Sequence, residues 1–228
     1  MKQYNVVLFD LDDTLINTAL DECKAIESVF TKHGLPFGDD VIEVYKTKND
    51  WQTYTLGELD AKAEFTNKFV QLLNNLSIKE NQDELVNDYF DLIQQSKTVT
   101  TDAKKVLASL RRRGYRLYLT ANGYSDFQRK RIELAGLSKY FDGVFISDEL
   151  VARKPCKAFF DNVMSRIPES NISKVLVVGD AQSTDILGAN NARMDSCWYN
   201  PLHKTPKYKS TYEIDDISQL LMLLKKKQ

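Results

Sequence analysis

Short runs of consecutive apolar residues recur along the chain and are separated by stretches with helical periodicity. The clearest runs cover residues 6–9, 115–119, 144–146 and 175–178, and a weaker one covers residues 197–199. Continuous apolar runs of this length are typical of strands that are buried on both faces, as in a parallel sheet. We therefore expect these segments to form the strands of one buried sheet.

Helices are expected between these strands. Apolar side chains at positions 103, 106, 107 and 110 have the spacing of one helix face. The other expected helices of this part of the chain cover residues 127–134, 158–167, 186–192 and 217–224, the last ended by three lysines at 225–227. Strands that alternate with helices predict an α/β fold, in which a parallel sheet carries helices on both faces.

The segment from residue 16 to residue 96 breaks this alternation. It contains no convincing buried strand, and its helical patterns cover residues 19–33, 60–73 and 82–95. We therefore expect residues 1–15 and 97–228 to form the α/β core and residues 16–96 to form an inserted helical domain.

Composition and charge narrow the class of protein. The chain has 228 residues, of which 43% are hydrophobic, and its net charge is −1. Nucleic-acid and membrane surfaces usually need a basic excess, so neither partner is expected. The three cysteines are widely spaced and the N-terminus lacks the apolar run of a signal peptide, so we expect reduced thiols in a cytoplasmic protein.

Acidic residues follow two of the expected strands. Asp10 and Asp12 come at the end of the first strand, and Asp180 and Asp185 follow the strand at residues 175–178. Ligands of open parallel sheets bind beyond the carboxyl ends of the strands, so the four side chains can converge on one site. The alternatives are that the first pair forms a turn and that Asp185 starts a helix.

Four clustered carboxylates repel one another, so a bound cation or partial protonation is required. Oxygen ligands with room for water and phosphate favour Mg²⁺. Lys154 follows the strand at residues 144–146 and can hold a phosphate and orient a carboxylate at the same edge. A solvated lysine before the turn at Pro155 is the alternative.

These motifs resemble those of the haloacid dehalogenase (HAD) superfamily in order and spacing. The matching segments are Phe9-Asp10-Leu11-Asp12-Asp13-Thr14, Lys154-Pro155, and Gly179-Asp180 followed by Asp185. Three motifs in order are far more specific than one Asp-x-Asp pair. The resemblance implies a Rossmann-like core, and it identifies residues 16–96 as a helical cap of the C1 type.

The resemblance also implies roles for these residues. Asp10 would attack phosphorus, while Asp12 would act as general acid and then as general base. Asp10, Asp180 and the carbonyl of Asp12 would hold Mg²⁺, with Asp185 supporting the metal site. Lys154 would neutralise charge on the phosphate and the carboxylate.

A closer resemblance links the chain to HAD nucleotidases that act on pyrimidine nucleoside monophosphates. It rests on Asn122-Gly123-Tyr124, Gly136-Leu137 and the segment from Cys197 to Pro201. One position departs from the family pattern, because the second motif usually ends in Ser or Thr before Asn-Gly. An ungapped register places Ala121 there beside Asn122 as the phosphate-binding segment, whereas a shift of one residue would place Thr120 there.

The leading hypothesis is therefore an Mg²⁺-dependent phosphomonoesterase that acts on a small phosphorylated metabolite. A dehalogenase fits poorly, because it needs neither Mg²⁺ nor an acid at Asp12. A phosphomutase of the same fold and a weakly active regulatory protein with an altered second motif remain open alternatives. His33 and His203 match no motif, and the cap aromatics Tyr45, Trp51, Tyr54 and Phe65 are expected mainly to fill the helical core.

Overall fold

The computed structural model of the protein describes residues 2–47, 61–168 and 171–225. The chain divides into two compact units. The core unit combines residues 1–17 and 99–228, and the cap unit comprises residues 18–98. The expected boundaries, at 15/16 and 96/97, lie close to these.

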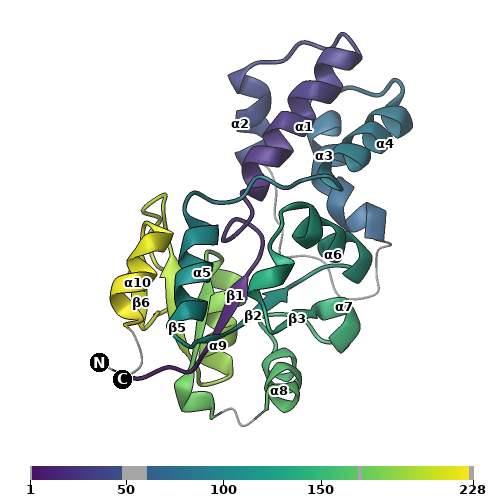
Figure 1. Cartoon of the computed structure of the whole chain (residues 1–228). Helices are drawn as coiled ribbons and strands as arrows, with labels where there is room; N and C mark the ends of the chain where they lie inside the picture. The colour runs from purple at the N-terminus through teal and green to yellow at the C-terminus, as the bar shows by residue number, and fades with distance from the viewer. Residues whose placement is uncertain (1, 48–60, 169–170, 226–228) are drawn as a thin grey trace. The chain divides into compact units, whose positions relative to one another are not determined.

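A six-stranded parallel sheet forms the centre of the core unit, with strand order β3-β2-β1-β4-β5-β6 (Figure 1). The strands are β1 Val6–Asp10, β2 Arg116–Ala121, β3 Gly143–Ile146, β4 Val175–Gly179, β5 Asp195–Tyr199 and β6 Tyr212–Ile214. Every residue of β1 and β4 is buried, as the continuous apolar runs predicted. The first strand lies between β2 and β4, so their carboxyl ends meet at one edge of the sheet.

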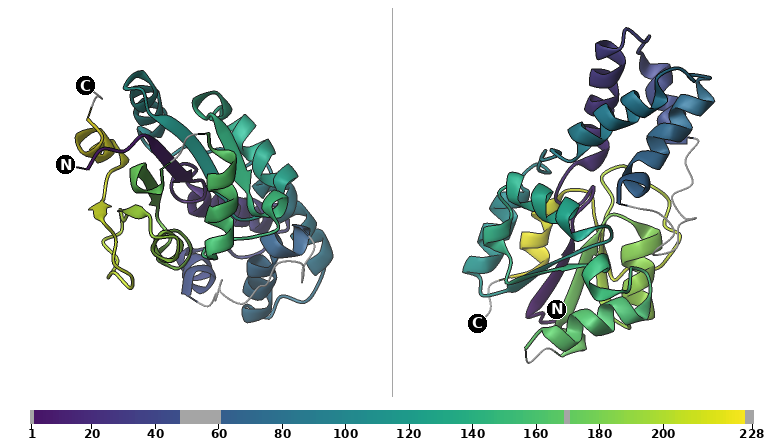
Figure 2. Two further views of the ribbon diagram at one scale, coloured as in Figure 1. Left: turned by 90° about the horizontal axis from the view of Figure 1, so that it is seen from below. Right: turned by 90° about the vertical axis from the view of Figure 1, so that its right-hand side faces the viewer.

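Helices cover both faces of this sheet (Figure 2). One face packs against α5 (Ala103–Arg112), α6 (Ser125–Leu134) and the C-terminal α10 (Leu220–Leu223). The other face packs against α8 (Lys157–Arg166) and α9 (Leu187–Asn191), and the short α7 (Ser147–Leu150) follows β3. The α/β fold with a Rossmann-like sheet and an inserted helical cap is confirmed.

The cap unit contains helices and no strand in the part of the chain that the structure describes. Its helices are α1 Thr18–Lys32, α2 Asp39–Thr47, α3 Ala61–Asn75 and α4 Gln82–Ile93. Their buried faces meet in an aromatic cluster, in which the rings of Phe69 and Tyr89 stack with centroids 4.3 Å apart. Phe30 packs edge-on against Phe69, so three helices share one apolar core.

The helices α2 and α7 and the strand β6 were not predicted from the sequence. They span only nine, four and three residues, so none presents a long periodic pattern. A π-helical turn, Gln182–Ile186, also precedes α9 and includes the first residue of the helix predicted over residues 186–192. The first of the three terminal lysines follows α10, and the other two lie outside the described residues.

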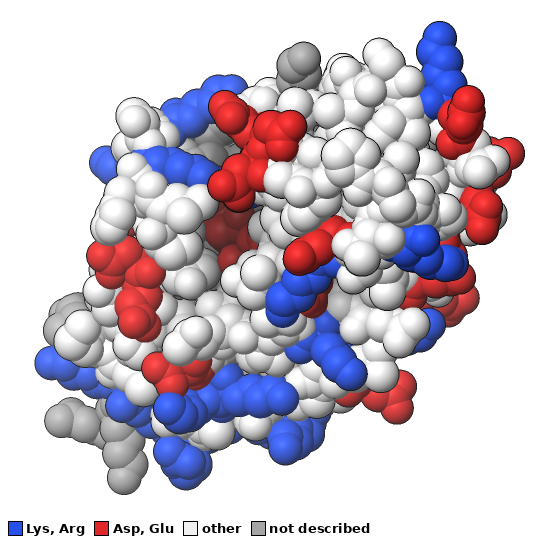
Figure 3. Space-filling model, turned by 90° about the horizontal axis from the view of Figure 1, so that it is seen from above, with Lys and Arg blue, Asp and Glu red and all other residues white. Residues whose placement is uncertain are grey.

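Among the described residues, no helix is long and apolar enough to cross a membrane. Lys and Arg side chains are interspersed with Asp and Glu side chains over the face shown in Figure 3. This mixture agrees with the net charge of −1.

Candidate active site

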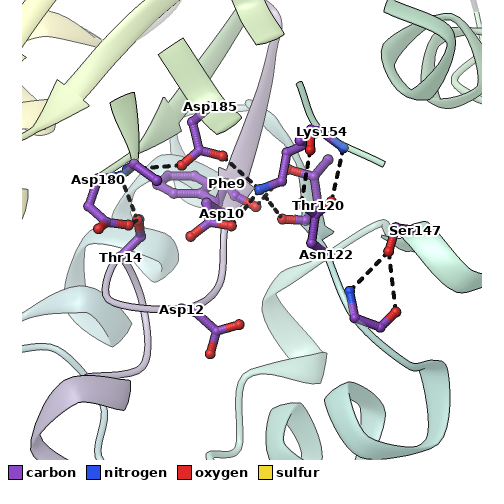
Figure 4. A network of polar contacts seen from close by, with 12 residues as sticks. Phe9, Asp10, Asp12, Thr14, Thr120, Asn122, Ser147, Lys154, Asp180 and Asp185 are labelled. Carbon is purple, nitrogen blue, oxygen red and sulfur yellow. Dashed lines mark hydrogen bonds and ion pairs between the residues drawn. The ribbon is translucent and has the colours of Figure 1, made fainter. Parts of the chain in front are cut away.

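The functional side chains predicted from the sequence gather at the carboxyl edge of the sheet (Figure 4). Asp10 is the last residue of β1, and Asp180 directly follows β4. Asn122 directly follows β2, and Lys154 lies in the loop between α7 and α8. The parallel register of β1 with both neighbours brings Asp10, Asn122 and Asp180 together, and Lys154 joins them through its bond to Asp10.

Lys154 is the buried centre of this group. Its ammonium donates to Asp10 Oδ1 at 2.5 Å and to Asp185 Oδ1 at 2.6 Å. It also donates to the carbonyl oxygen of Thr120 at 3.3 Å, so all three ammonium donors have an acceptor. Because the Lys154 side chain is only 2% exposed, a lysine in solvent before a turn is not what the structure contains.

Asn122 fixes the backbone that carries this lysine. The amide N–H of Lys154 donates to Asn122 Oδ1 at 2.9 Å, and Asn122 Nδ2 donates to the Lys154 carbonyl at 3.0 Å. Both ends of the Asn122 side-chain amide therefore contact Lys154. A role for Asn122 in phosphate binding stays a prediction for its main chain, because its side chain holds the loop.

Three carboxylates lie close enough together to share a cation. One oxygen each from Asp10, Asp180 and Asp185 falls within a group whose members are all within 4.8 Å of one another. Burial, together with the like charge of Asp185, raises the pKa of Asp10 to about 8 although Lys154 opposes the shift. Burial and the charges of Asp10 and Asp185 also raise the pKa of Asp180 well above its ordinary value.

Lys154 remains charged in this setting. Burial alone would lower the pKa of its ammonium, but the carboxylates of Asp10 and Asp185 outweigh burial and raise the pKa above its ordinary value. The lysine therefore supplies fixed positive charge to the buried edge of the sheet.

Gly179 allows Asp185 to approach the end of β4. A Cβ atom at this position would lie 2.3 Å from Asp185 Cγ, closer than atoms can pack. The Asp185 carboxylate also accepts from the amide N–H of Ala181 at 3.2 Å. The glycine of the Gly-Asp motif is thus a requirement of space for the carboxylate five residues after Asp180.

Thr14 and Trp198 orient Asp180, and neither was given a role from the sequence. The Thr14 hydroxyl donates to Asp180 Oδ1 at 3.1 Å and accepts from the Asp180 amide N–H at 3.0 Å. Trp198 Nε1 donates to the Asp180 carbonyl at 2.8 Å. The sequence signal for Thr14 is its place at the end of the first motif.

Asp12 points to a different set of partners. Arg131 Nη1 donates to Asp12 Oδ1 at 2.6 Å, and Gln128 Nε2 donates to Asp12 Oδ2 at 2.9 Å. The Asp12 side chain is 35% exposed and is not a member of the three-carboxylate group. Among the described residues, the Asp12 side chain thus lies outside the group of carboxylates able to hold a cation, and the role of its carbonyl stays a prediction.

The side chains of Thr120 and Ala121, in the second motif, are both buried. Thr120 is buried, and its hydroxyl donates to the carbonyl oxygen of Phe9 at 3.2 Å. Ala121 is fully buried and belongs to the hydrophobic cluster that contains Phe9 and Leu119. The Thr120 hydroxyl is thus bonded to the backbone of the adjacent strand.

The remaining candidates have other surroundings. His33 pairs with Asp88 at 2.6 Å within the cap, and His203 is 76% exposed. Tyr45 is buried in the cap core, which agrees with the packing role expected for it. Phe65 is partly buried, while Trp51 and Tyr54 lie outside the described residues.

The chain belongs to the haloacid dehalogenase-like hydrolases, because the model of that family matches residues 4–193. It is 32% identical to the pyrimidine 5′-nucleotidase PynA of Streptococcus pneumoniae, over 98% of this chain and 96% of that protein. It is 26% identical to the pyrimidine 5′-nucleotidase YjjG of Escherichia coli, over 97% and 98% of the two chains.

A third relative has a solved structure. The chain is 30% identical to the HAD-hydrolase YfnB of Bacillus subtilis over 98% of this chain and 97% of that protein. The crystal structure of YfnB with magnesium bound superposes with a TM-score of 0.86 and covers 98% of this chain and 99% of that chain. Family and relatives together make this protein a HAD-type phosphatase, as the motifs predicted.

Proposed function

We propose that this protein is an Mg²⁺-dependent phosphomonoesterase that hydrolyses nucleoside monophosphates through a phosphoryl group carried on Asp10. The observation that carries the proposal is the contact of Asp10 with Lys154, beside Asp180 and Asp185 at the carboxyl edge of the sheet. The nucleotide class rests on the similarity to PynA and YjjG, which are pyrimidine 5′-nucleotidases.

In the first step an oxygen of Asp10 attacks phosphorus, and the bond from phosphorus to the ester oxygen breaks. Asp12 gives its proton to that ester oxygen, so the leaving group departs as a neutral alcohol. In the second step water attacks phosphorus, Asp12 takes the proton of that water, and the Asp10 carboxylate is released. Lys154 offsets negative charge on Asp10 and on the phosphate throughout.

The residues at this edge fit Mg²⁺. Asp10 and Asp180 with the carbonyl of Asp12 would hold the ion, and Asp185 would support it, since three neighbouring carboxylates offer the hard oxygen ligands that Mg²⁺ prefers. The raised pKa values of Asp10 and Asp180 also support a cation site. A nearby cation would favour the ionised form of both carboxylates and so oppose these shifts. When bound, Mg²⁺ would neutralise charge on the phosphate and help to orient it.

One feature of the second motif bears on phosphate binding. The bond of the Thr120 hydroxyl to the Phe9 carbonyl supports the register in which Ala121 occupies the motif position. Phosphate binding by this segment would then rely on main-chain N–H groups near Ala121 and Asn122.

The protein is further expected to be cytoplasmic and to take a small phosphorylated metabolite rather than nucleic acid.

The test is release of phosphate by the purified full-length protein from a panel of substrates. The panel contains UMP, CMP, dUMP, AMP, GMP and p-nitrophenyl phosphate, each measured with and without Mg²⁺. Hydrolysis that needs Mg²⁺ and favours pyrimidine nucleotides is expected. Asp10→Asn should lower kcat more than about 1000-fold, because an amide is a poor nucleophile.

The control for charge removal is Asp161→Asn, on an exposed site of α8 where Asp161 pairs with Lys157. This variant should keep wild-type turnover. A bisphosphate intermediate in the same assay would point to a phosphomutase instead. Asp10→Asn with wild-type activity would sink the assignment of the nucleophile.

A further inference from the structure

The helix α6 places two buried polar side chains against Asp12. Arg131 is 1% exposed and Gln128 is fully buried. Each donates to a different oxygen of the Asp12 carboxylate, at 2.6 Å and 2.9 Å. A carboxylate held at both oxygens by two side chains of one helix has little freedom to rotate.

The two donors also fix each other. Arg131 Nη1 donates to Gln128 Oε1 at 2.9 Å, and Gln128 Nε2 donates to the carbonyl oxygen of Asn122 at 2.9 Å. These contacts set the orientation of the Gln128 amide, with its NH₂ group toward Asp12. Because Asn122 also holds Lys154, the same stretch of chain supports both Asp12 and the lysine that contacts Asp10.

A buried arginine at position 131 lowers the stability of the fold unless its charge is compensated by a partner. Positions 127, 128, 131 and 132 are the buried positions of α6, and Phe127 and Ile132 fill two of them with apolar side chains. An apolar residue at 131 would pack without the cost of taking a charge out of water. The guanidinium lies 5.3 Å from the Phe127 ring and reaches past it to Asp12, whose carboxylate is partly open to solvent.

We propose that Arg131 and Gln128 are positioning residues that hold the Asp12 carboxylate in the orientation from which it transfers protons to and from the reacting oxygens. The inference rests on the proposed function, because it concerns the same reaction. Both residues donate directly to the Asp12 carboxylate, so their effect is placed on Asp12 rather than on metal or phosphate binding.

The experiment compares Arg131→Met, Asp12→Ala and wild-type protein on UMP and on p-nitrophenyl phosphate. UMP has a poor alkyl leaving group and depends on protonation, whereas p-nitrophenol leaves with little help. Arg131→Met should lower kcat on UMP about 10- to 100-fold, the effect of losing one charge-assisted hydrogen bond, and should lower kcat on p-nitrophenyl phosphate much less. KM should change little for either substrate.

The decisive readout is the combination of the two substitutions. If Arg131 acts through Asp12, the double variant Asp12→Ala/Arg131→Met should be within about twofold of Asp12→Ala alone on UMP. Lys130→Met is the matched control, because it removes a cation from an exposed position of the same helix. This control should keep wild-type kinetics on both substrates.

A second variant keeps the inference open to refutation if Arg131→Met fails to fold. Gln128→Met removes the other donor to Asp12 and should show the same leaving-group dependence with a smaller loss, about three- to tenfold. Equal losses on both substrates, or additive losses in the Asp12→Ala background, would overturn the inference. Failure of the proposed function would look different, because Asp10→Asn would then retain activity whatever Arg131 does.

Discussion

Carboxylates in the core and in the cap have opposite surroundings. In the core, the buried Asp10 and Asp185 lie beside the partly buried Asp180, and burial with mutual repulsion raises the pKa of Asp10 and of Asp180. In the cap, Asp21 accepts from the Ser96 hydroxyl at 2.7 Å and from the amide N–H groups of residues 97 and 98 at 2.9 Å.

The consequences for pKa differ accordingly. Burial alone would raise the pKa of Asp21, but the hydrogen bonds from Thr98, Ser96 and the Lys97 amide outweigh burial and hold the pKa below its ordinary value. The cap thus uses a carboxylate to join α1 to the segment that follows α4. In the core, burial and mutual repulsion of the carboxylates oppose folding. Such an arrangement is typical of a catalytic site.

The largest expected effect is that of metal removal. EDTA should abolish turnover and Mg²⁺ should restore it, because a divalent cation relieves the repulsion among the core carboxylates. Calorimetry should show that Mg²⁺ raises Tm by a few degrees, since a ligand that binds only the folded state stabilises it. Ca²⁺ should also raise Tm but support little turnover. Full activity of the metal-free protein would contradict the interpretation of the core carboxylates as a cation site.

Asp180→Asn should separate activity from stability. Turnover should fall by about 100-fold or more, because a ligand to the cation is lost. The metal-free variant should be more stable than metal-free wild type at pH 7, by at least about 1 kcal/mol, because an amide cannot ionise in this buried cluster.

The raised pKa of Asp180 determines how the stability difference between Asp180→Asn and wild type changes with pH. The folded state binds the proton more tightly than the unfolded state, so stability is lost as the pH rises through the unfolded pKa toward the folded pKa. Urea denaturation in EDTA at several pH values measures the difference between wild type and Asp180→Asn. A difference that does not grow with pH would contradict the account of the cluster.

The second motif offers a gain of function. Ala121→Ser should raise kcat/KM about 10- to 100-fold if the hydroxyl reaches the phosphate, and Thr120→Val should change it little. Thr120 is bonded to the Phe9 carbonyl, and Ala121 is fully buried, so the gain requires space for one oxygen. The opposite pair of results, a crippled Thr120→Val and a neutral Ala121→Ser, would assign the motif position to Thr120.

The smallest expected effect on activity belongs to the cap. Asp21→Asn should lower the free energy of unfolding by about 1 kcal/mol at pH 7, at the low end of the range for charged hydrogen bonds because Asp21 is partly exposed. Turnover of p-nitrophenyl phosphate should stay near wild type. Asp91→Asn, at an exposed position of α4, is the matched control and should change neither quantity.

The stability contributed by Asp21 depends on pH in the opposite direction to that contributed by Asp180. The depressed pKa of Asp21 stabilises the folded state above the unfolded pKa, and this stabilisation is lost as the pH falls through the folded pKa. The difference between Asp21→Asn and wild type should therefore shrink below about pH 4. A difference that persists unchanged in acid would show that Asp21 contributes as a neutral group.

The sequence predicted those parts of the molecule that have long or motif-bearing patterns. The strand at residues 6–9 and the helix at residues 103–110 were found because apolar periodicity is strong there. Asp10, Lys154, Asp180 and Asp185 were grouped correctly at one sheet edge because parallel strands bring their carboxyl ends together.

Positions without such a pattern escaped prediction. Arg131 escaped because periodicity assigns a charged residue to the surface, although its spacing from the apolar Phe127 places it on the buried face of α6. The pairing of Asp12 with Gln128 escaped as well, because the residues are far apart in the chain.

The central claim is that Asp10 carries the phosphoryl group. Acid quench of the enzyme during turnover of [³²P]UMP, followed by proteolysis and mass spectrometry, reports this directly. We predict a phosphorylated peptide that contains Asp10, loses its label to hydroxylamine as an acyl phosphate does, and is absent from Asp10→Asn. Steady turnover with no label on Asp10, or with label on another residue, would contradict the account.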